Sequence, residues 1–184
     1  QKITEGEADG CPDPDGQTYL DQPRYYSDDD WTLDNNKKFD TSDGDIEVMV
    51  DGELTFKSNI EINGDNQVRI YVNDTVSYSG SPRINTGGNP ENLVLLAHTD
   101  VDEIKDGGNA QFTGYIYAPG SEFNMNGNGR VTPNLLGGVV ANTVDAQTAR
   151  INHVNPSFQL EIGQGVNALT FLHISTNPVV VTGT

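Results

Sequence analysis

The stretch GYIYAPGSEFNMNGNGR, residues 114–130, combines several local patterns within a short length. It alternates apolar and polar residues as a strand does, breaks at Pro119-Gly120, alternates again through Phe123 and Met125, and ends in an Asn/Gly run. Pro and Gly end strands, and Asn and Gly tolerate a left-handed backbone at the least steric cost. The stretch therefore predicts two short strands joined by a sharp corner and followed by a polar hinge.

The same pattern recurs along the chain. Each repeat reads as an apolar triplet, a two-residue corner, a second alternating strand, a polar hinge and a third short strand. The triplets are spaced by 22, 25, 21 and 23 residues and begin at Val48, Ile70, Leu95, Ile116 and Val139. Three strands per repeat of this length is the periodicity of a parallel β-helix. We therefore predict an all-β fold: a right-handed parallel β-helix of about five rungs.

A β-helix buries alternate residues of each strand in one narrow core, because no rung can bury its own face alone. The 20 Gly and 9 Pro residues suit an all-β chain with many turns better than helices. We expect these side chains to point into the core: Leu54, Phe56, Ile60, Ile62, Phe112, Ile116, Phe123, Met125 and Val131.

The pattern divides the chain into three parts. Residues 1–44 are rich in Asp and Pro and are predicted to form an irregular acidic N-terminal cap or arm. Residues 45–156 are predicted to form the β-helix. Residues 157–184 read as two or three longer strands, which form either a cap or a terminal hairpin packed along the coil.

The charge balance restricts the partners. Ten basic residues against 27 acidic ones give a formal net charge of −17. Such a chain repels nucleic acid and anionic membrane surfaces. It contains no run of 18 apolar residues that would predict a membrane span. A high carboxylate content also suits a high-salt environment, where self-repulsion is screened.

Two segments resemble a known group of proteins: GYIYAPGSEFNMNGNGRVTPNLLGGVVANTVDAQTARINHV and the closing ALTFLHISTNPVVVTGT. They are similar to the C-terminal β-helical module of prokaryotic, haloarchaeal-like pilin-like and pilus-assembly surface proteins. The resemblance covers roughly residues 45–182. It implies an extracellular protein of the cell surface, from a halophilic archaeon or a bacterium. In many relatives a hydrophobic helix precedes the module; we expect either that it was removed or that the module is deployed without it, as in a capsid spike or filament.

We therefore expect a non-enzymatic structural or adhesive module of a cell-surface appendage or extracellular filament. Its partners would be further copies of itself or other surface and pilus subunits, and its open ends or its C-terminal strand could add to another sheet. The alternative is a glycan-binding or polysaccharide-degrading β-helix protein. In that case Tyr71, Tyr78, Tyr115 and Tyr117 would offer stacking surfaces for sugars.

No catalytic residue is predicted. Cleavage of acidic polysaccharides needs a base aided by cationic groups, and the basic residues are scattered at about one per rung: Lys57, Arg69, Arg83, Lys105, Arg130 and Arg150. His98, His153 and His173 have no metal-binding spacing. No G-x-S-x-G motif accompanies the Ser and Thr residues.

The segment DGCPDPDGQTYLD contains the strongest candidate for a metal site. Asp13, Asp15 and Asp21, with a Gly where the chain turns, approximate an oxygen-ligand loop for Ca²⁺. However, the first ligand of the EF-hand pattern would fall on Cys11, so the alternative is a Pro/Gly turn with solvated carboxylates. We expect no required cofactor, with calcium as the candidate ion. The role of Cys11 stays open, because a single cysteine cannot form an internal disulfide.

Asn73 begins the sequon Asn73-Asp74-Thr75. The other Asn-x-Ser/Thr match, at Asn155, is blocked by Pro156. Because Asn73 falls on a predicted corner, a glycan attached there would project outward.

Overall fold

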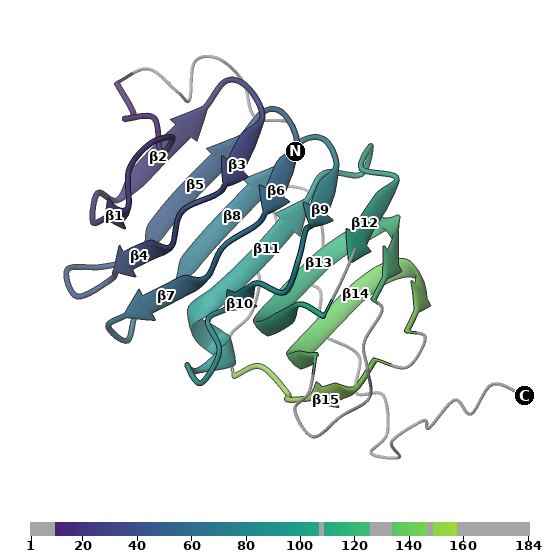
Figure 1. Ribbon diagram of the computed structural model, residues 1–184. Helices are drawn as coiled ribbons and strands as arrows, with labels where there is room; N and C mark the ends of the chain where they lie inside the picture. The colour runs from purple at the N-terminus through teal and green to yellow at the C-terminus, as the bar shows by residue number, and fades with distance from the viewer. Residues whose placement is uncertain (1–9, 107–108, 126–133, 147–148, 158–184) are drawn as a thin grey trace, which may run out of the picture.

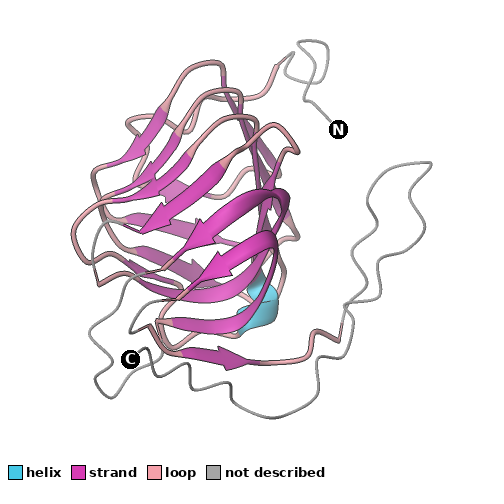
Figure 2. Cartoon of the chain, turned by 90° about the vertical axis from the view of Figure 1, so that its right-hand side faces the viewer, coloured by secondary structure: helices cyan, strands magenta, loops and turns pink. Residues whose placement is uncertain are grey.

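The computed structural model describes residues 10–106, 109–125, 134–146 and 149–157, and it shows a parallel β-solenoid (Figure 1). The chain winds through about five turns. The strands lie one above another along the coil (Figure 2). Within the described residues the only helix is the short 3₁₀ helix η2 (Pro90–Asn92), and no helix there is long and apolar enough to cross a bilayer.

Each turn contributes to three ladders, in which every strand pairing is parallel. The first ladder stacks β2 (Arg24–Ser27), β5 (Ile46–Val50), β8 (Val68–Val72), β11 (Leu93–Ala97) and the middle parts of β13 (Gln111–Asn124) and β14 (Leu135–Asp145). The second ladder stacks β3 (Trp31–Leu33), β6 (Leu54–Phe56), β9 (Val76–Tyr78), β12 (Glu103–Asp106) and the ends of β13 and β14. The third ladder stacks β1 (Tyr19–Leu20), β4 (Lys37–Asp40), β7 (Ile60–Asn63), β10 (Arg83–Ile84), the beginnings of β13 and β14, and β15 (Ile151–His153).

The predicted repeat is confirmed by the register of the first ladder. Val48 pairs with Ile70, Ile70 with Leu95, Leu95 with Ile116, and Ile116 with Val139. All five predicted triplets therefore lie in one ladder of adjacent parallel strands. Each turn supplies the backbone hydrogen-bond partners of the next, as a coil of this period requires.

The solenoid begins earlier than predicted, so the boundary at residue 45 is wrong. Strands β1 to β4 continue all three ladders into residues 19–40, and Tyr25 pairs with Val48 in the first ladder. The Asp-rich run after β2 is a corner between two ladders, comparable with the later corners. Among the described residues, 10–18 precede the first strand, and two of them accept hydrogen bonds from the first turn: Tyr26 N donates to Pro12 O and Lys38 N donates to Thr18 O. The predicted tail lies outside the described residues from residue 158 onward.

The opening stretch of sequence forms most of β13. Its Pro119-Gly120 corner is confirmed as an irregularity in the ladder: Ala118 pairs with Ala141 and Glu122 with Thr143, so β13 has three residues where β14 has one. In β13 and in β14, one continuous strand passes from the third ladder into the first without a loop. Residues 126–133 lie outside the described residues. In the third ladder, Leu135 pairs with Phe112.

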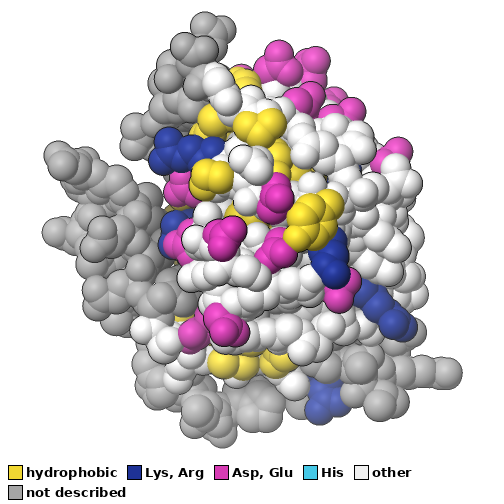
Figure 3. Space-filling view, turned by 90° about the vertical axis from the view of Figure 1, so that its left-hand side faces the viewer, with side chains coloured by type: hydrophobic (Ala, Val, Ile, Leu, Met, Phe, Trp, Pro, Cys, Tyr) yellow, Lys and Arg dark blue, Asp and Glu magenta, His cyan; other side chains and the backbone are white. Residues whose placement is uncertain are grey.

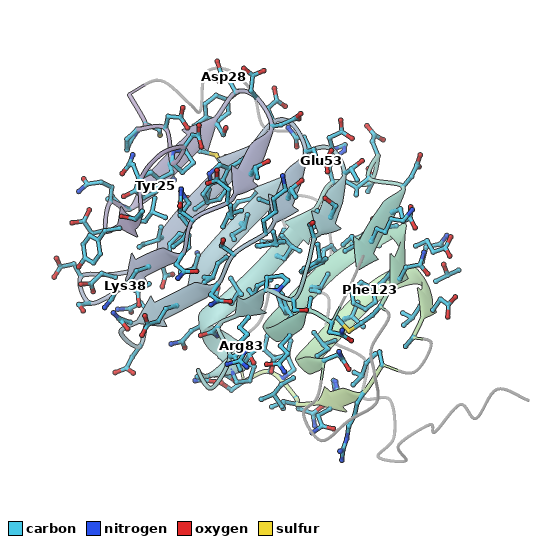
Figure 4. The ribbon with its side chains drawn as sticks, viewed as in Figure 1. Tyr25, Asp28, Lys38, Glu53, Arg83 and Phe123 are labelled. Carbon is cyan, nitrogen blue, oxygen red and sulfur yellow. The ribbon has the colours of Figure 1, made fainter. Side chains whose placement is uncertain are left out.

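The core fills the space between the three ladders. Of the predicted core residues, Ile62 is half-buried, Val131 lies outside the described residues, and the other seven are buried. Phe56 stacks on Tyr78 with ring centroids 5.0 Å apart, and Tyr78 meets the edge of Phe112 at 6.5 Å. In Figure 4 the core side chains lie inside the coil, whereas Asp28 lies at the corner between the first and second ladders.

Candidate functional site

The outer side of the first ladder carries one row of apolar side chains, unlike that of the second ladder. The register aligns one outward-facing residue from each turn, which we call the apolar row: Tyr26, Met49, Tyr71, Leu96 and Tyr117. The equivalent outward row of the second ladder is polar: Thr32, Thr55, Ser77, Lys105 and Asn124. Parallel strands that are covered on both faces read as continuous apolar runs, and β11 has such a sequence, LVLLA.

The neighbouring outward-facing row of the first ladder changes from charged to apolar side chains along the coil. In the first turns it consists of charged side chains, with Arg24 3.0 Å from Glu47 and Arg69 2.8 Å from Asp45. Exposed ion pairs of this kind stabilise a fold by only about 0–1 kcal/mol each. In the later turns the same row holds Val94 and Tyr115, which are fully buried although they face away from the core.

Tyr115 is held between the sheet and the chain that follows β15. A side-chain carbon at Gly138 would lie 3.2 Å from the ring of Tyr115, so the absence of a side chain there makes room for the ring. The Tyr115 hydroxyl donates to Val154 O at 3.1 Å. Burial, together with the nearby carboxylate of Glu91, raises the pKa of Tyr115 to about 12. Tyr115 is therefore an internal contact in this structure.

The chain after β15 is bonded to the start of the fourth strand of the first ladder. Ser157 N donates to Glu91 Oε1 at 2.6 Å, and Ser157 Oγ donates to Glu91 Oε2 at 2.8 Å. These two bonds lower the pKa of Glu91. Sequence reasoning missed this contact, because the two residues are 66 positions apart.

The four tyrosines considered for sugar stacking do not form one surface. Tyr78 faces the core, is 3% exposed and stacks on Phe56, so its assignment to an outer surface is wrong. Tyr71 and Tyr117 are half-buried in the apolar row on either side of Leu96. On the face shown in Figure 3, hydrophobic side chains are interspersed with acidic and basic ones.

Of the predicted calcium ligands, Asp13 and Asp15 lie before β1 and Asp21 directly follows it. Asp15 N donates to Asp13 Oδ1 at 2.8 Å, and Asp21 Oδ1 accepts from Gln22. Among the residues that the structure describes, no group of three or more His, Cys, Asp and Glu side chains is placed to hold a metal ion. The structure thus does not bring Asp13, Asp15 and Asp21 together as one site. Cys11 is half-buried.

Asn73 lies on the predicted corner, between β8 and β9, and is half-buried. Its Nδ2 donates to Asp51 Oδ1 at 2.6 Å. A glycan would replace one of the two N–H groups on this nitrogen and leave the other for Asp51.

The two histidines that the structure describes bond to near neighbours in the chain. His98 Nδ1 accepts from Asp100 N at 3.3 Å, and His153 Nε2 lies 2.9 Å from Asn155 Oδ1. His98 follows β11 in the first ladder, whereas His153 ends β15 in the third. His173 lies outside the described residues.

The two ends of the coil differ, which the sequence did not predict. At the N-terminal end Leu20, Tyr25 and Trp31 have no exposed surface. At the other end, within the described residues, the first and second ladders finish with β14, whereas the third continues to β15. In β14, Val144 pairs with the core residue Phe123 yet is 48% exposed. Val139 is only half-buried there. Within the described residues, the middle and end of β14 thus form a sheet edge with apolar side chains.

Comparisons with known proteins bear on the family alone. Searches of curated proteins and of solved structures found no match. A family model described as "Domain of unknown function (DUF7305)" matches residues 1–160, which include every described strand. The chain therefore belongs to the DUF7305 family.

Proposed function

We propose that this protein is a non-enzymatic, extracellular structural or adhesive module of a cell-surface appendage or filament. It assembles by adding a strand of a neighbouring subunit, either a second copy or another surface protein, to the end of its solenoid. The observation that carries the proposal is the difference between the two ends. One end has a fully buried core, and the other presents the middle and end of β14 with Val144 exposed.

A sheet edge with unpaired backbone groups recruits another strand unless charge, proline or a covering segment blocks it. The second-ladder part of β14, Thr143-Val144-Asp145, has an apolar residue at its centre, no proline and one charged residue at its end. An incoming strand would cover the exposed side chain of Val144. Because this edge differs from the opposite end, contact between copies would be head-to-tail or between unlike surfaces, the arrangement that builds open filaments.

The surface charge fits the extracellular, halophilic setting that the resemblance implies. A net charge of −17 keeps a protein soluble in concentrated salt, where repulsion between acidic subunits is screened. We therefore expect self-association to strengthen as salt is raised. The pilin-like origin of the module is part of the same proposal.

The test compares the edge with an exposed position in the middle of the coil. Val144 is 48% exposed, and Ser81 is exposed between β9 and β10, away from both ends. Lysine at a sheet edge opposes strand addition, so Val144→Lys is expected to weaken self-association at least about tenfold, equal to ~1.4 kcal/mol. Ser81→Lys, which changes the net charge by the same amount, is the matched control and should leave it unchanged. Sedimentation velocity in molar salt measures both, and equal behaviour of the two variants contradicts the proposed edge.

A glycan-binding function is the second candidate, favoured by one observation. Tyr71 and Tyr117 lie in the apolar row two turns apart, or about 9.6 Å at the usual strand spacing. A glycan-array screen in molar salt, with and without calcium, tests it. Retention of a saccharide that is lost in Tyr117→Ala favours binding, and cleavage of any saccharide overturns the non-enzymatic proposal.

A further inference from the structure

The chain that leaves β15 travels along the outer side of the first ladder toward the N-terminal end of the coil. Val154 lies beside Tyr115 in β13, the fifth strand of that ladder. Three residues later, Ser157 is bonded to Glu91, which lies just before β11, the fourth strand. The path therefore climbs by one turn between these two contacts.

The surface beyond Ser157 is the apolar row. Leu96 and Tyr71 lie in the fourth and third strands of the ladder, and burial raises the pKa of Tyr71 even though it faces outward. Leu96, Tyr71 and Met49 lie in successive turns of the row; the first two are half-buried and Met49 is buried. A row of this kind on the outside of a parallel sheet is what a covered face looks like.

The remaining part of the chain has the composition to cover it. Residues 158–184 contain one charged residue, Glu161, in a protein in which 20% of residues are charged. Their sequence includes the apolar runs ALTFLHI and VVV. The row from Leu96 to Met49 spans about 10 Å at the usual strand spacing, and an extended chain covers that distance in roughly three residues.

We propose that residues 158–184 dock on the apolar row of the same chain. The alternative occupant is a second copy of this protein. At low ionic strength two bodies that each carry a formal charge of −17 repel one another, whereas a nearly uncharged segment tethered at Ser157 meets no such barrier and has a high effective concentration. The inference does not rest on the proposed function, which concerns the edge of β14.

Hydrogen exchange on the full-length protein tests the proposal, with mass spectrometry as the readout. We expect slow exchange of amides within residues 158–184, and an increase of about tenfold or more in their rate in Leu96→Glu, which places a carboxylate in the row. The matched control is Lys105→Gln, which faces outward in the following strand, β12, and changes the net charge by the same amount. It should leave the exchange of residues 158–184 unchanged.

Amides of β5 and β8 report whether the variants keep their fold. If Leu96→Glu also accelerates those amides, Phe171→Asp replaces it, because that substitution leaves every described residue intact. Fast exchange of residues 158–184 in the unmodified protein overturns the proposal, as does protection that neither substitution reduces. Protection that disappears on a hundredfold dilution assigns the row to a second copy and also overturns it.

Discussion

The stacked pair formed by Phe56 and Tyr78 offers the sharpest test of the coil. Phe56 lies in β6, has no exposed surface and packs on Tyr78, which occupies the equivalent place one turn later. Truncation to alanine leaves a cavity that adjacent turns cannot close without breaking the register of the ladder. We therefore expect Phe56→Ala to destabilise the whole stack of turns around it.

The magnitude follows from the burial. An aromatic side chain buries about 200 Å², which at about 25 cal/mol per Å² corresponds to roughly 5 kcal/mol. Because the alanine side chain keeps a small part of this stabilisation, Phe56→Ala is expected to lower the free energy of unfolding by ~4 kcal/mol, within the range seen for buried Phe→Ala changes. Phe56→Leu keeps most of the volume and should cost only about 1.5 kcal/mol. Combined with Tyr78→Leu in a double-mutant cycle, it should reveal a coupling of about 1 kcal/mol from ring stacking.

Urea unfolding followed by tryptophan fluorescence measures these changes. Trp31 is the only tryptophan, and it lies in β3, which pairs directly with β6. With a urea dependence of about 2 kcal/mol per molar, Phe56→Ala should lower the midpoint by about 2 M. Lys57→Ala, an exposed neighbour in the chain, is the control and should stay within about 0.5 kcal/mol. If both variants unfold at the same midpoint, Phe56 is not between the ladders and the fold described above is wrong.

Three further predictions use other parts of the coil. Gly137 has φ +137°, and a side-chain carbon there would collide with the carbonyl oxygen of Gly114, whereas Gly80, with φ +79°, has open space around it. In thermal unfolding, Gly137→Ala should therefore lower the free energy of unfolding by ~3 kcal/mol or more, and Gly80→Ala by only about 1 kcal/mol. The pKa of Tyr115 is raised from 10.0 to about 12, so its contribution to stability is complete below pH 10 and is lost as the pH rises toward 12. Urea unfolding at pH 9 and pH 11.5 should show a smaller decline in Tyr115→Phe than in the unmodified protein, and an equal decline contradicts this burial. Hydrogen bonds from the hydroxyl of Ser42 and, with a smaller effect, from the hydroxyl of Tyr19 lower the pKa of the Asp40 carboxyl from 3.8 to about 2. NMR titration should show a higher pKa for Asp40 in Ser42→Ala.

The candidate surfaces were only partly predictable, for reasons visible in particular residues. The inward orientation of Tyr78 could have been predicted, because Phe56, a predicted core residue, lies 22 residues earlier. The contact of the buried Tyr115 with Val154 could not, because the two residues are 39 positions apart in the chain. The early start of the coil was hidden by Asp-rich corners, whose charge suggested an irregular cap although the short strands between them alternate regularly.

The period, the register of the apolar triplets and most of the predicted core follow from the sequence. A coil whose hydrogen bonds run between turns must place equivalent apolar residues at a constant spacing, and that spacing can be read from the chain. The folded structure was needed to show that Tyr115 is buried on the outer side of the first ladder and that Val144 is exposed in β14. Alternation assigns a residue to one side of a strand, but what lies against that side depends on contacts such as Ser157 with Glu91, which join residues 66 positions apart.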